Sequence, residues 1–282
     1  MNFTRRIAAI LLALIMITAA CGTAFADNAS ETDALAYLNG QLRVGMECAY
    51  APNNWQESEA SDTNVPIENV PGAYAEGYDV QIAGIIAEQL GLELVVVKMD
   101  WDGLIEALNQ GQIDAIIAGM ADTESHKEAI NFSTPYHETV YALMVNAGTP
   151  YENATSLADF AGASVLGQKD TALDWTIDQI EGVNHLPAVA SVPDMIARLQ
   201  QGTCDAIVIN LENFPGYQAV NPDFVAISFP EGEGLDPGFR GACVGLRKSD
   251  DALLDLVNEI LATIDQEQRD ELWDTALNSQ PT

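Results

Sequence analysis

The stretch "NQGQIDAIIAG" at residues 109–119 returns, with substitutions, as "QQGTCDAIVIN" at residues 200–210. Both copies contain Gln-Gly, two intervening residues, Asp-Ala and then an apolar run. A glycine after an amphipathic stretch is typical of a helix C-terminus, and a short apolar run is typical of a buried strand. Helix–glycine–strand units are common. However, Gln-Gly and Asp-Ala occur at the same spacing in both copies. This favours two related α/β lobes over a chance similarity.

The first copy lies within an alternation of strands and helices. The sequence predicts strands at 42–46, 92–97 and 113–119, and helices at 78–91 and 101–111. Such alternation predicts a parallel sheet with helices packed on its faces. The intervening segment 51–77 has no period and many turn-forming residues, so we expect a long loop there.

The second copy lies within a similar series. The sequence predicts a short helix and strand at 156–167, helices at 171–180 and 192–202, a strand at 204–210 and two amphipathic helices at 250–265 and 266–277. Ligands of open α/β sheets bind beyond the carboxyl ends of the strands. We therefore expect the residues that follow each Asp-Ala-Ile strand to line a cleft between the lobes.

Composition excludes one class of partner. The chain has 282 residues, enough for two compact lobes, and a net charge of -31. Only 9 basic residues follow position 21, against 42 acidic ones, so a phosphate-binding stripe is absent and nucleic acid is excluded as a partner. Those basic residues are Arg43, Lys98, Lys127, Lys169, Arg198, Arg240, Arg247, Lys248 and Arg269.

The N-terminus is predicted to be an export signal. Arg5 and Arg6 precede an apolar stretch at 7–20, which is too short for a stop-transfer helix. Cleavage before Cys21 would leave a lipid-anchored cysteine, whereas cleavage before Asp27 would give a periplasmic or secreted protein. Since no later segment reaches ~18 uninterrupted apolar residues, we expect an extracytoplasmic protein that contacts the membrane only through a lipid anchor.

The remaining cysteines leave two alternatives. Cys48, Cys204 and Cys243 are odd in number, so they cannot all pair within the chain. They are expected to be small buried apolar residues, or else one disulfide and one free thiol.

Several segments in order across residues 42–277 resemble one family. The chain is similar to the family-3 extracellular solute-binding proteins of ABC importers, the binders of polar amino acids. The resemblance implies an α/β, two-lobed fold of the periplasmic-binding-protein type II-like class, with two hinge strands around a cleft. The segments are "LRVGMECAYAPNNW", "GYDVQIAGIIAEQLG", "WDGLIEALNQGQIDAIIAGM", "TESHKEAINFSTPY" and "ARLQQGTCDAIVIN".

The resemblance also implies domain boundaries. The implied divisions are a signal peptide at 1–21 or 1–26, a tether at 22–41, lobe 1 at 42–138 plus 243–282, lobe 2 at 142–239, and hinges near 138–142 and 239–243.

In lobe 1 the resemblance assigns three side chains to the ligand. Tyr50 and Trp101 match aromatic positions that sandwich the ligand side chain, and Glu47 matches an acidic position nearby. An aromatic face attracts a cationic ligand by about 0.5–2 kcal/mol. The alternatives from the sequence are core packing for Trp101 and a solvated edge charge for Glu47.

Backbone groups are implied at five further positions. Ala118, Gly119 and Ala121 match residues whose main chain contacts the α-amino and α-carboxylate groups of the ligand. Thr171 and Ala172, at the start of a predicted helix, match a pair whose backbone donates to the carboxylate.

Two residues depart from the family pattern. The motif usually written Thr-x-x-Arg reads Thr-Glu-Ser-His at 123–126, so His126 replaces the arginine that clamps the carboxylate. Asn210 replaces the acid that holds the ammonium. Each neutral replacement weakens the hold on a zwitterion by about 1–2 kcal/mol. His126 could also be a surface helix residue that never contacts the ligand.

Three interpretations of the ligand follow. It is an amino acid for which Lys127 or Lys169 supplies the missing positive charge, or a different small solute such as a modified amino acid, amide or amine. Alternatively, His126 makes a pH-dependent contact.

The expected function is that of a monomeric solute receptor for an ABC permease, without cofactor or metal. The alternative is an enzyme resembling cyclohexadienyl dehydratases, which share this fold. Catalysis requires a tuned acid or base, and nothing in the sequence pairs with Glu47 or His126. The three histidines, His126, His137 and His185, lack metal-ligand spacing. A sensor domain would need an added membrane helix or kinase.

Overall fold

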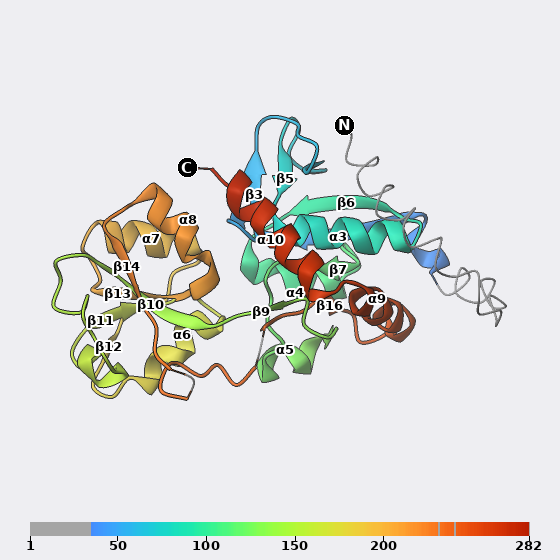
Figure 1. Ribbon diagram of the computed structural model, residues 1–282. Helices are drawn as coiled ribbons and strands as arrows, with labels where there is room; N and C mark the ends of the chain where they lie inside the picture. Colours follow the sequence, from blue (N-terminus) through green and yellow to red (C-terminus); the bar gives the residue numbers. More distant parts are fainter. Residues whose placement is uncertain (1–34, 231, 240, 282) are drawn as a thin grey trace.

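Two α/β lobes lie side by side in the computed structural model, which describes residues 35–230, 232–239 and 241–281 (Figure 1). The predicted signal peptide, with Cys21 and both cleavage sites, lies outside these residues. The described chain begins near a 3-10 helix, η1 (Ala36–Leu38), and Leu38 is buried in the core of lobe 1. The end of the predicted tether therefore packs against the fold.

Lobe 1 contains a five-stranded sheet in the order β6-β1-β7-β16-β8. β1 is parallel to β6 and β7, as predicted, while β16 is antiparallel to β7 and β8. The strands are β1 (Gln41–Met46), β6 (Glu93–Lys98), β7 (Ala115–Ile116), β8 (Asn131–Phe132) and β16 (Gly245–Leu246). The helices are α3 (Tyr78–Gln89), η2 (Trp101–Gly103), α4 (Leu104–Asn109), α5 (Glu124–Ala129), α9 (Asp251–Thr263) and α10 (Gln266–Ser279).

Lobe 2 contains a second five-stranded sheet in the order β12-β11-β13-β10-β14. β11 is parallel to β12 and β13, while β10 is antiparallel to β13 and β14. The strands are β10 (Tyr141–Asn146), β11 (Ser164–Leu166), β12 (Asn184–His185), β13 (Ala206–Asn210) and β14 (Phe224–Ile227). The helices are η3 (Leu157–Phe160), α6 (Ala172–Trp175), η4 (Thr176–Gln179), α7 (Val192–Gln200), η5 (Leu211–Asn213) and α8 (Phe214–Val220).

The repeated sequence folds in the same way in both lobes. In lobe 1, the N–H of Asp114 donates to the carbonyl of Arg43 (2.7 Å), whose own N–H donates to the Asp114 carboxylate (3.1 Å). In lobe 2, Asp205 makes the same two bonds with Ser164, both at 2.8 Å. The aspartate that occurs in both copies therefore has one physical role: it lies just before its strand and makes two hydrogen bonds with a residue of the neighbouring strand.

The glycine of each repeat ends a helix. Gly111 and Gly202 have φ of 73° and 65°, a left-handed conformation that costs glycine little. Each turn directs the chain from α4 or α7 back into the sheet.

The prediction of a long loop at 51–77 is wrong. With β2 (Ala49–Tyr50), this segment forms a small antiparallel sheet from β3 (Asn54–Glu57), β4 (Val65–Pro66) and β5 (Tyr74–Glu76). Strands of two to four residues are too short to give a visible period. Two other elements are shorter than predicted. The strand expected at 113–119 is only β7, and the helix expected at 171–180 is α6 followed by η4.

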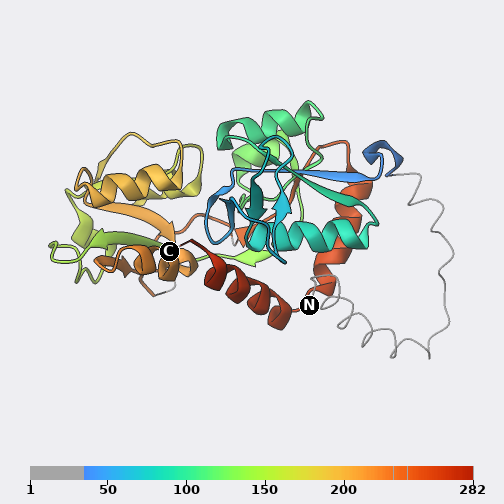
Figure 2. The ribbon, with the colours of Figure 1, turned by 90° about the horizontal axis from the view of Figure 1, so that it is seen from above.

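Two short strands pair where the chain passes between the lobes. β9 (His137–Glu138) is antiparallel to β15 (Gly241–Ala242), and Figure 2 shows the lobes on either side of this region. Each lobe has a separate buried core. Tyr50 is an exception, because it comes from the lobe 1 side of the chain and is buried in the core of lobe 2. The lobe boundaries given above stay a prediction.

Cys48, Cys204 and Cys243 are free and buried, so the alternative with a disulfide is wrong. Burial raises the pKa of these thiols to about 12, 11 and 12 respectively. Within the described parts of the chain, no helix is long and apolar enough to cross a membrane, and no cluster of side chains could hold a metal ion.

Candidate ligand-binding cleft

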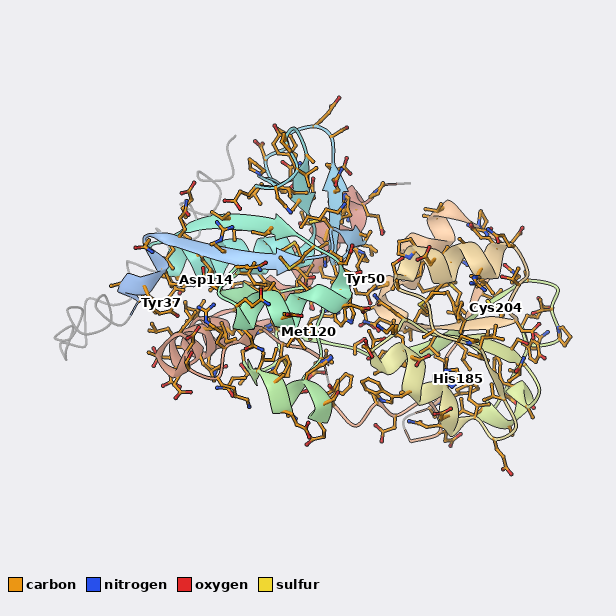
Figure 3. All side chains as sticks on the ribbon, turned by 180° about the vertical axis from the view of Figure 1, so that it is seen from behind. Tyr37, Tyr50, Asp114, Met120, His185 and Cys204 are labelled. Carbon is orange, nitrogen blue, oxygen red and sulfur yellow. The ribbon has the colours of Figure 1, made fainter. Side chains whose placement is uncertain are left out.

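A cleft lies between the two lobes, with about 430 Å³ of empty space when the open solvent at its mouth is included. All ten residues proposed from the sequence to contact a ligand line it: Glu47, Tyr50, Trp101, Ala118, Gly119, Ala121, His126, Thr171, Ala172 and Asn210. Figure 3 labels Tyr50 at the junction of the lobes. Four further lining residues were missed: Thr123, Tyr141, Gln168 and Leu173.

Glu47 lies in the lobe 1 wall, directly after β1. Burial raises the pKa of its carboxyl group to about 7, and the nearby Asp100 and Asp102 raise it further, while a hydrogen bond from the Gln168 side chain of lobe 2 opposes the rise. Glu47 is half-buried and lines the cleft, which favours the ligand position over a solvated edge charge. Glu47 can hold or release a proton near neutral pH.

Aromatic rings form much of the remaining wall. Tyr50 and Tyr141 are each 9% exposed, and Trp101 is half-buried where η2 begins. Trp101 packs partly against the core of lobe 1 and also lines the cleft, so packing and a ligand contact are compatible.

His126 is buried, with 8% of its surface exposed, so it is not an exposed surface residue. Thr123 caps α5 by accepting a hydrogen bond from the backbone N–H of His126 (3.1 Å). The ring Nδ1 lies 3.1 Å from the carbonyl oxygen of Ala121. Because a carbonyl only accepts, Nδ1 must carry the proton. The neutral ring then presents Nε2 as an acceptor, and Nε2 donates only as an imidazolium.

The backbone N–H of Gly119 is already bonded within the protein. It donates to the hydroxyl of Tyr136 (3.0 Å), which donates to Asp79 (2.7 Å). The other carboxylate oxygen of Asp79 accepts from the Asn54 amide (2.8 Å), and burial raises the pKa of this fully buried acid. Gly119 therefore contributes surface to the cleft, and its N–H is not free to bind a carboxylate.

In lobe 2, Thr171 caps α6 by accepting from the N–H of Leu173 (3.2 Å). The backbone N–H groups of Thr171 and Ala172 have no acceptor among the described residues, so they can donate to a ligand. The buried Oδ1 of Asn210 likewise has no partner in the part of the chain that the structure describes. Together these groups of lobe 2 offer two neutral backbone donors and, in the Oδ1 of Asn210, one neutral acceptor.

Comparison with known proteins agrees with this geometry. The family described as "Bacterial extracellular solute-binding proteins, family 3" matches residues 42–275. The chain belongs to this family.

The names of two relatives of this family-3 protein state which amino acid each one binds. A "Probable histidine-binding protein" of Neisseria gonorrhoeae is 27% identical over 273 residues, covering 94% of this chain and 91% of that protein. The "L-cystine-binding protein TcyJ" of Escherichia coli K12 is 26% identical over 229 residues, covering 81% and 79%. A crystal structure of the substrate binding protein of an amino acid ABC transporter is 27% identical with a TM-score of 0.71, covering 85% of this chain and 100% of that one.

Lys127 and Lys169 are the two lysines that could replace the family arginine. Neither lines the cleft of this family-3 protein, and each is held by two acids outside it. The pairs are Lys127 with Asp122 (2.8 Å) and Glu124 (3.3 Å), and Lys169 with Asp102 (2.6 Å) and Asp170 (3.3 Å). The interpretation in which a lysine supplies the missing charge therefore loses its support.

Proposed function

We propose that this protein captures a small polar solute, an amino acid or a close derivative, outside the cytoplasm and delivers it to the permease of an ABC importer. The observation that carries the proposal is a single cleft lined from both lobes by every residue that the family pattern assigns to the ligand. The names of its relatives, which bind histidine and cystine, support the same class of solute.

The walls suit a solute with an extended polar body. Tyr50, Trp101 and Tyr141 offer apolar area and π-faces, while Glu47 and Asn210 offer oxygen acceptors. The lobes close on the solute, and the closed form is what a permease would recognise.

We further propose that the protein acts as a monomer, is exported by the segment that precedes position 27, and is anchored by lipid at Cys21 if cleavage occurs there. Neither the anchor nor the monomeric state is needed for the cleft to work. Mass spectrometry of the exported protein would distinguish a lipidated N-terminus at Cys21 from a free one at Asp27.

Binding, and not catalysis, is the proposed outcome. Glu47 and His126 are the titratable groups in the cleft besides the tyrosines, and no hydrogen bond joins them among the described contacts. A bound solute recovered unchanged after prolonged incubation would support this. A product released with turnover would favour the alternative, an enzyme similar to cyclohexadienyl dehydratases.

A solute panel tests the proposal. Thermal shift across amino acids, their amides, amines and short peptides should raise the melting temperature for a small polar compound, because a ligand of the native state stabilises it by mass action. Trp101→Ala should abolish the shift, while Tyr37→Ala, at an exposed aromatic residue outside the cleft, should preserve it. Silence across the whole panel would contradict the proposal.

A further inference from the structure

The lining of the cleft includes no fixed positive charge among the residues that the structure describes. Among its lining residues are one carboxyl group, Glu47, and one imidazole, His126, but no lysine or arginine. Asp100 and Asp102 lie close enough to Glu47 to raise its pKa by repulsion. The electrostatic field at this end of the cleft is therefore negative.

Lys169 and Lys127 do not readily reverse that field, because acids already hold them. Lys169 is shared between Asp102 and Asp170, and Lys127 is shared between Asp122 and Glu124. A lysine that left its two acids to meet a ligand would leave those acids unpaired. Each cluster has a net negative charge with the lysine in place.

The cleft offers a ligand several hydrogen-bond acceptors, and its own donors are neutral, so it favours a ligand that is rich in donors. Glu47 is an acceptor when ionised, the Oδ1 of Asn210 is buried without a partner, and the neutral ring of His126 presents Nε2 as an acceptor. The Gly119 N–H is occupied by Tyr136. The donors without a partner among the described residues are all neutral: the N–H groups of Thr171 and Ala172, the indole N–H of Trp101, the amide of Asn210 and the hydroxyls of Tyr50 and Tyr141.

A ligand carboxylate would be poorly compensated here. Moving an ionised carboxylate out of water is costly unless a cation or several good donors replace the lost hydration. Next to an ionised Glu47 it would also meet a like charge. An ammonium or guanidinium group would meet aromatic faces and acceptors, which compensate for its hydration.

We propose that the ligand is a small organic cation without a free carboxylate: an amine or guanidine in which the acid group of an amino acid is absent, amidated or esterified. This specifies the solute of the cleft, and so it rests on the proposed function. The cation contacts Glu47 and the rings of Tyr50 and Trp101, while its remaining N–H groups donate to Asn210 and His126.

Matched sets of compounds test the class by isothermal titration calorimetry on the exported full-length protein. The sets are L-arginine, agmatine and L-argininamide; L-lysine, cadaverine and L-lysinamide; and L-ornithine and putrescine. In at least one set, the amine or amide should bind about tenfold or more tightly than the parent acid, since it avoids the burial of an uncompensated carboxylate.

The outcomes separate the inference from the function on which it rests. If no set shows that preference, because each parent amino acid binds as tightly as its amine or amide or because only carboxylate-bearing solutes of the wider panel bind, the inference is overturned while the receptor function stands. If no compound in these sets or in the wider panel binds, both are overturned.

Two variants sharpen the test. His126→Arg restores a fixed cation, so it should shift the preference about tenfold towards the parent acid. Glu47→Gln should weaken the amine about tenfold or more, whereas Glu88→Gln, at an exposed acid on α3, should leave it unchanged. Circular dichroism shows whether each variant folds. If a variant does not fold, the matched compound sets measured on the wild-type protein decide the inference. An unaltered preference in a folded His126→Arg protein contradicts the placement of that residue.

Discussion

The ammonium group of Lys169 in lobe 2 lies 2.6 Å from the carboxylate of Asp102 in lobe 1, so an ion pair joins the lobes beside the cleft. Both side chains are about half exposed, at 53% and 47%, which limits what the pair contributes to stability. Because the pair joins the two lobes, it stabilises their present arrangement relative to one in which they move apart.

The first prediction concerns this pair. Lys169→Met should weaken ligand binding by about two- to fivefold, mainly through faster dissociation, because an exposed pair contributes less than about 1 kcal/mol to closure. The melting temperature without ligand should change little. Stopped-flow kinetics at low and high salt measures the effect, which should shrink at high salt.

Lys127→Met is the matched control. Lys127 is similarly exposed and also contacts two acids, but both belong to lobe 1. Equal loss of affinity in the two variants would show that the effect is a general change in charge and not one of lobe closure.

The second prediction concerns the pH dependence of binding. Since the pKa of Glu47 is raised to about 7, affinity for a cationic ligand should increase as the pH rises from about 6 to 8, where the carboxyl group loses its proton. Titration calorimetry in buffers of different ionisation enthalpy should detect proton release on binding. The charged groups that act on Glu47, Asp100 and Asp102, are retained in Glu47→Gln, so this variant should flatten the profile.

The third prediction concerns stability without ligand. A carboxyl group whose pKa is higher in the folded state than in the unfolded state costs stability as the pH rises from about 4.5 to about 7, and the full cost remains above that. Glu47→Gln should therefore raise the melting temperature at pH 8 more than at pH 4.5. A larger gain at the lower pH would contradict a raised pKa.

The sequence predicted much of the sheet framework, and the reason is local. Gly111 and Gly202 end helices, and the runs after Asp114 and Asp205 are long enough to be recognised as strands. The small sheet at 51–77 was missed because its strands are too short for a period. The bond between Gly119 and Tyr136 depends on tertiary contact, which no local pattern encodes.

The family motifs predicted which residues line the cleft. They did not predict the charges and hydrogen-bond partners of those residues. The sequence left Lys127 and Lys169 open as partners of a ligand, because spacing along the chain does not reveal which acids surround a lysine. The tautomer of His126 likewise follows from the carbonyl of Ala121, five residues away.

The fourth prediction concerns His185 in lobe 2. Partial burial lowers the pKa of this histidine, but hydrogen bonds to Asp178 (2.8 Å) and Asp174 (2.9 Å) outweigh it, and the pKa is raised. The stabilisation is present below pH 6.5 and is lost as the pH rises through the raised pKa. His185→Gln should thus lower the melting temperature at pH 5.5 more than at pH 8.5. An equal loss at both values would contradict a charged pair.

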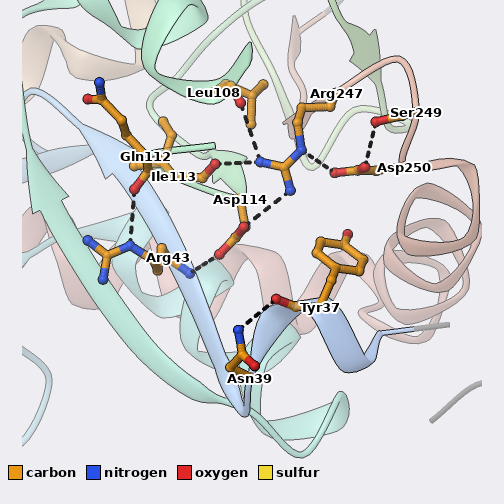
Figure 4. Close-up of polar contacts among 10 residues, drawn as sticks. All are labelled: Tyr37, Asn39, Arg43, Leu108, Gln112, Ile113, Asp114, Arg247, Ser249 and Asp250. Carbon is orange, nitrogen blue, oxygen red and sulfur yellow. Dashed lines mark hydrogen bonds and ion pairs between the residues drawn. The ribbon is translucent and has the colours of Figure 1, made fainter. Parts of the chain in front are cut away.

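The fifth prediction returns to the repeated aspartates. Asp114 and Asp205 each accept a backbone N–H from the adjacent strand, but Asp114 also accepts from Arg247 (3.2 Å), whose guanidinium group donates to the carbonyl of Ile113 (2.7 Å) (Figure 4). Asp114→Ala should therefore cost about 2–3 kcal/mol of unfolding free energy and Asp205→Ala about 1–2 kcal/mol, because only the first leaves a largely buried cation with a lost partner. Urea denaturation of both variants measures the difference. Equal costs would mean that Arg247 contributes nothing through Asp114, and that the two copies of the repeat are energetically equivalent.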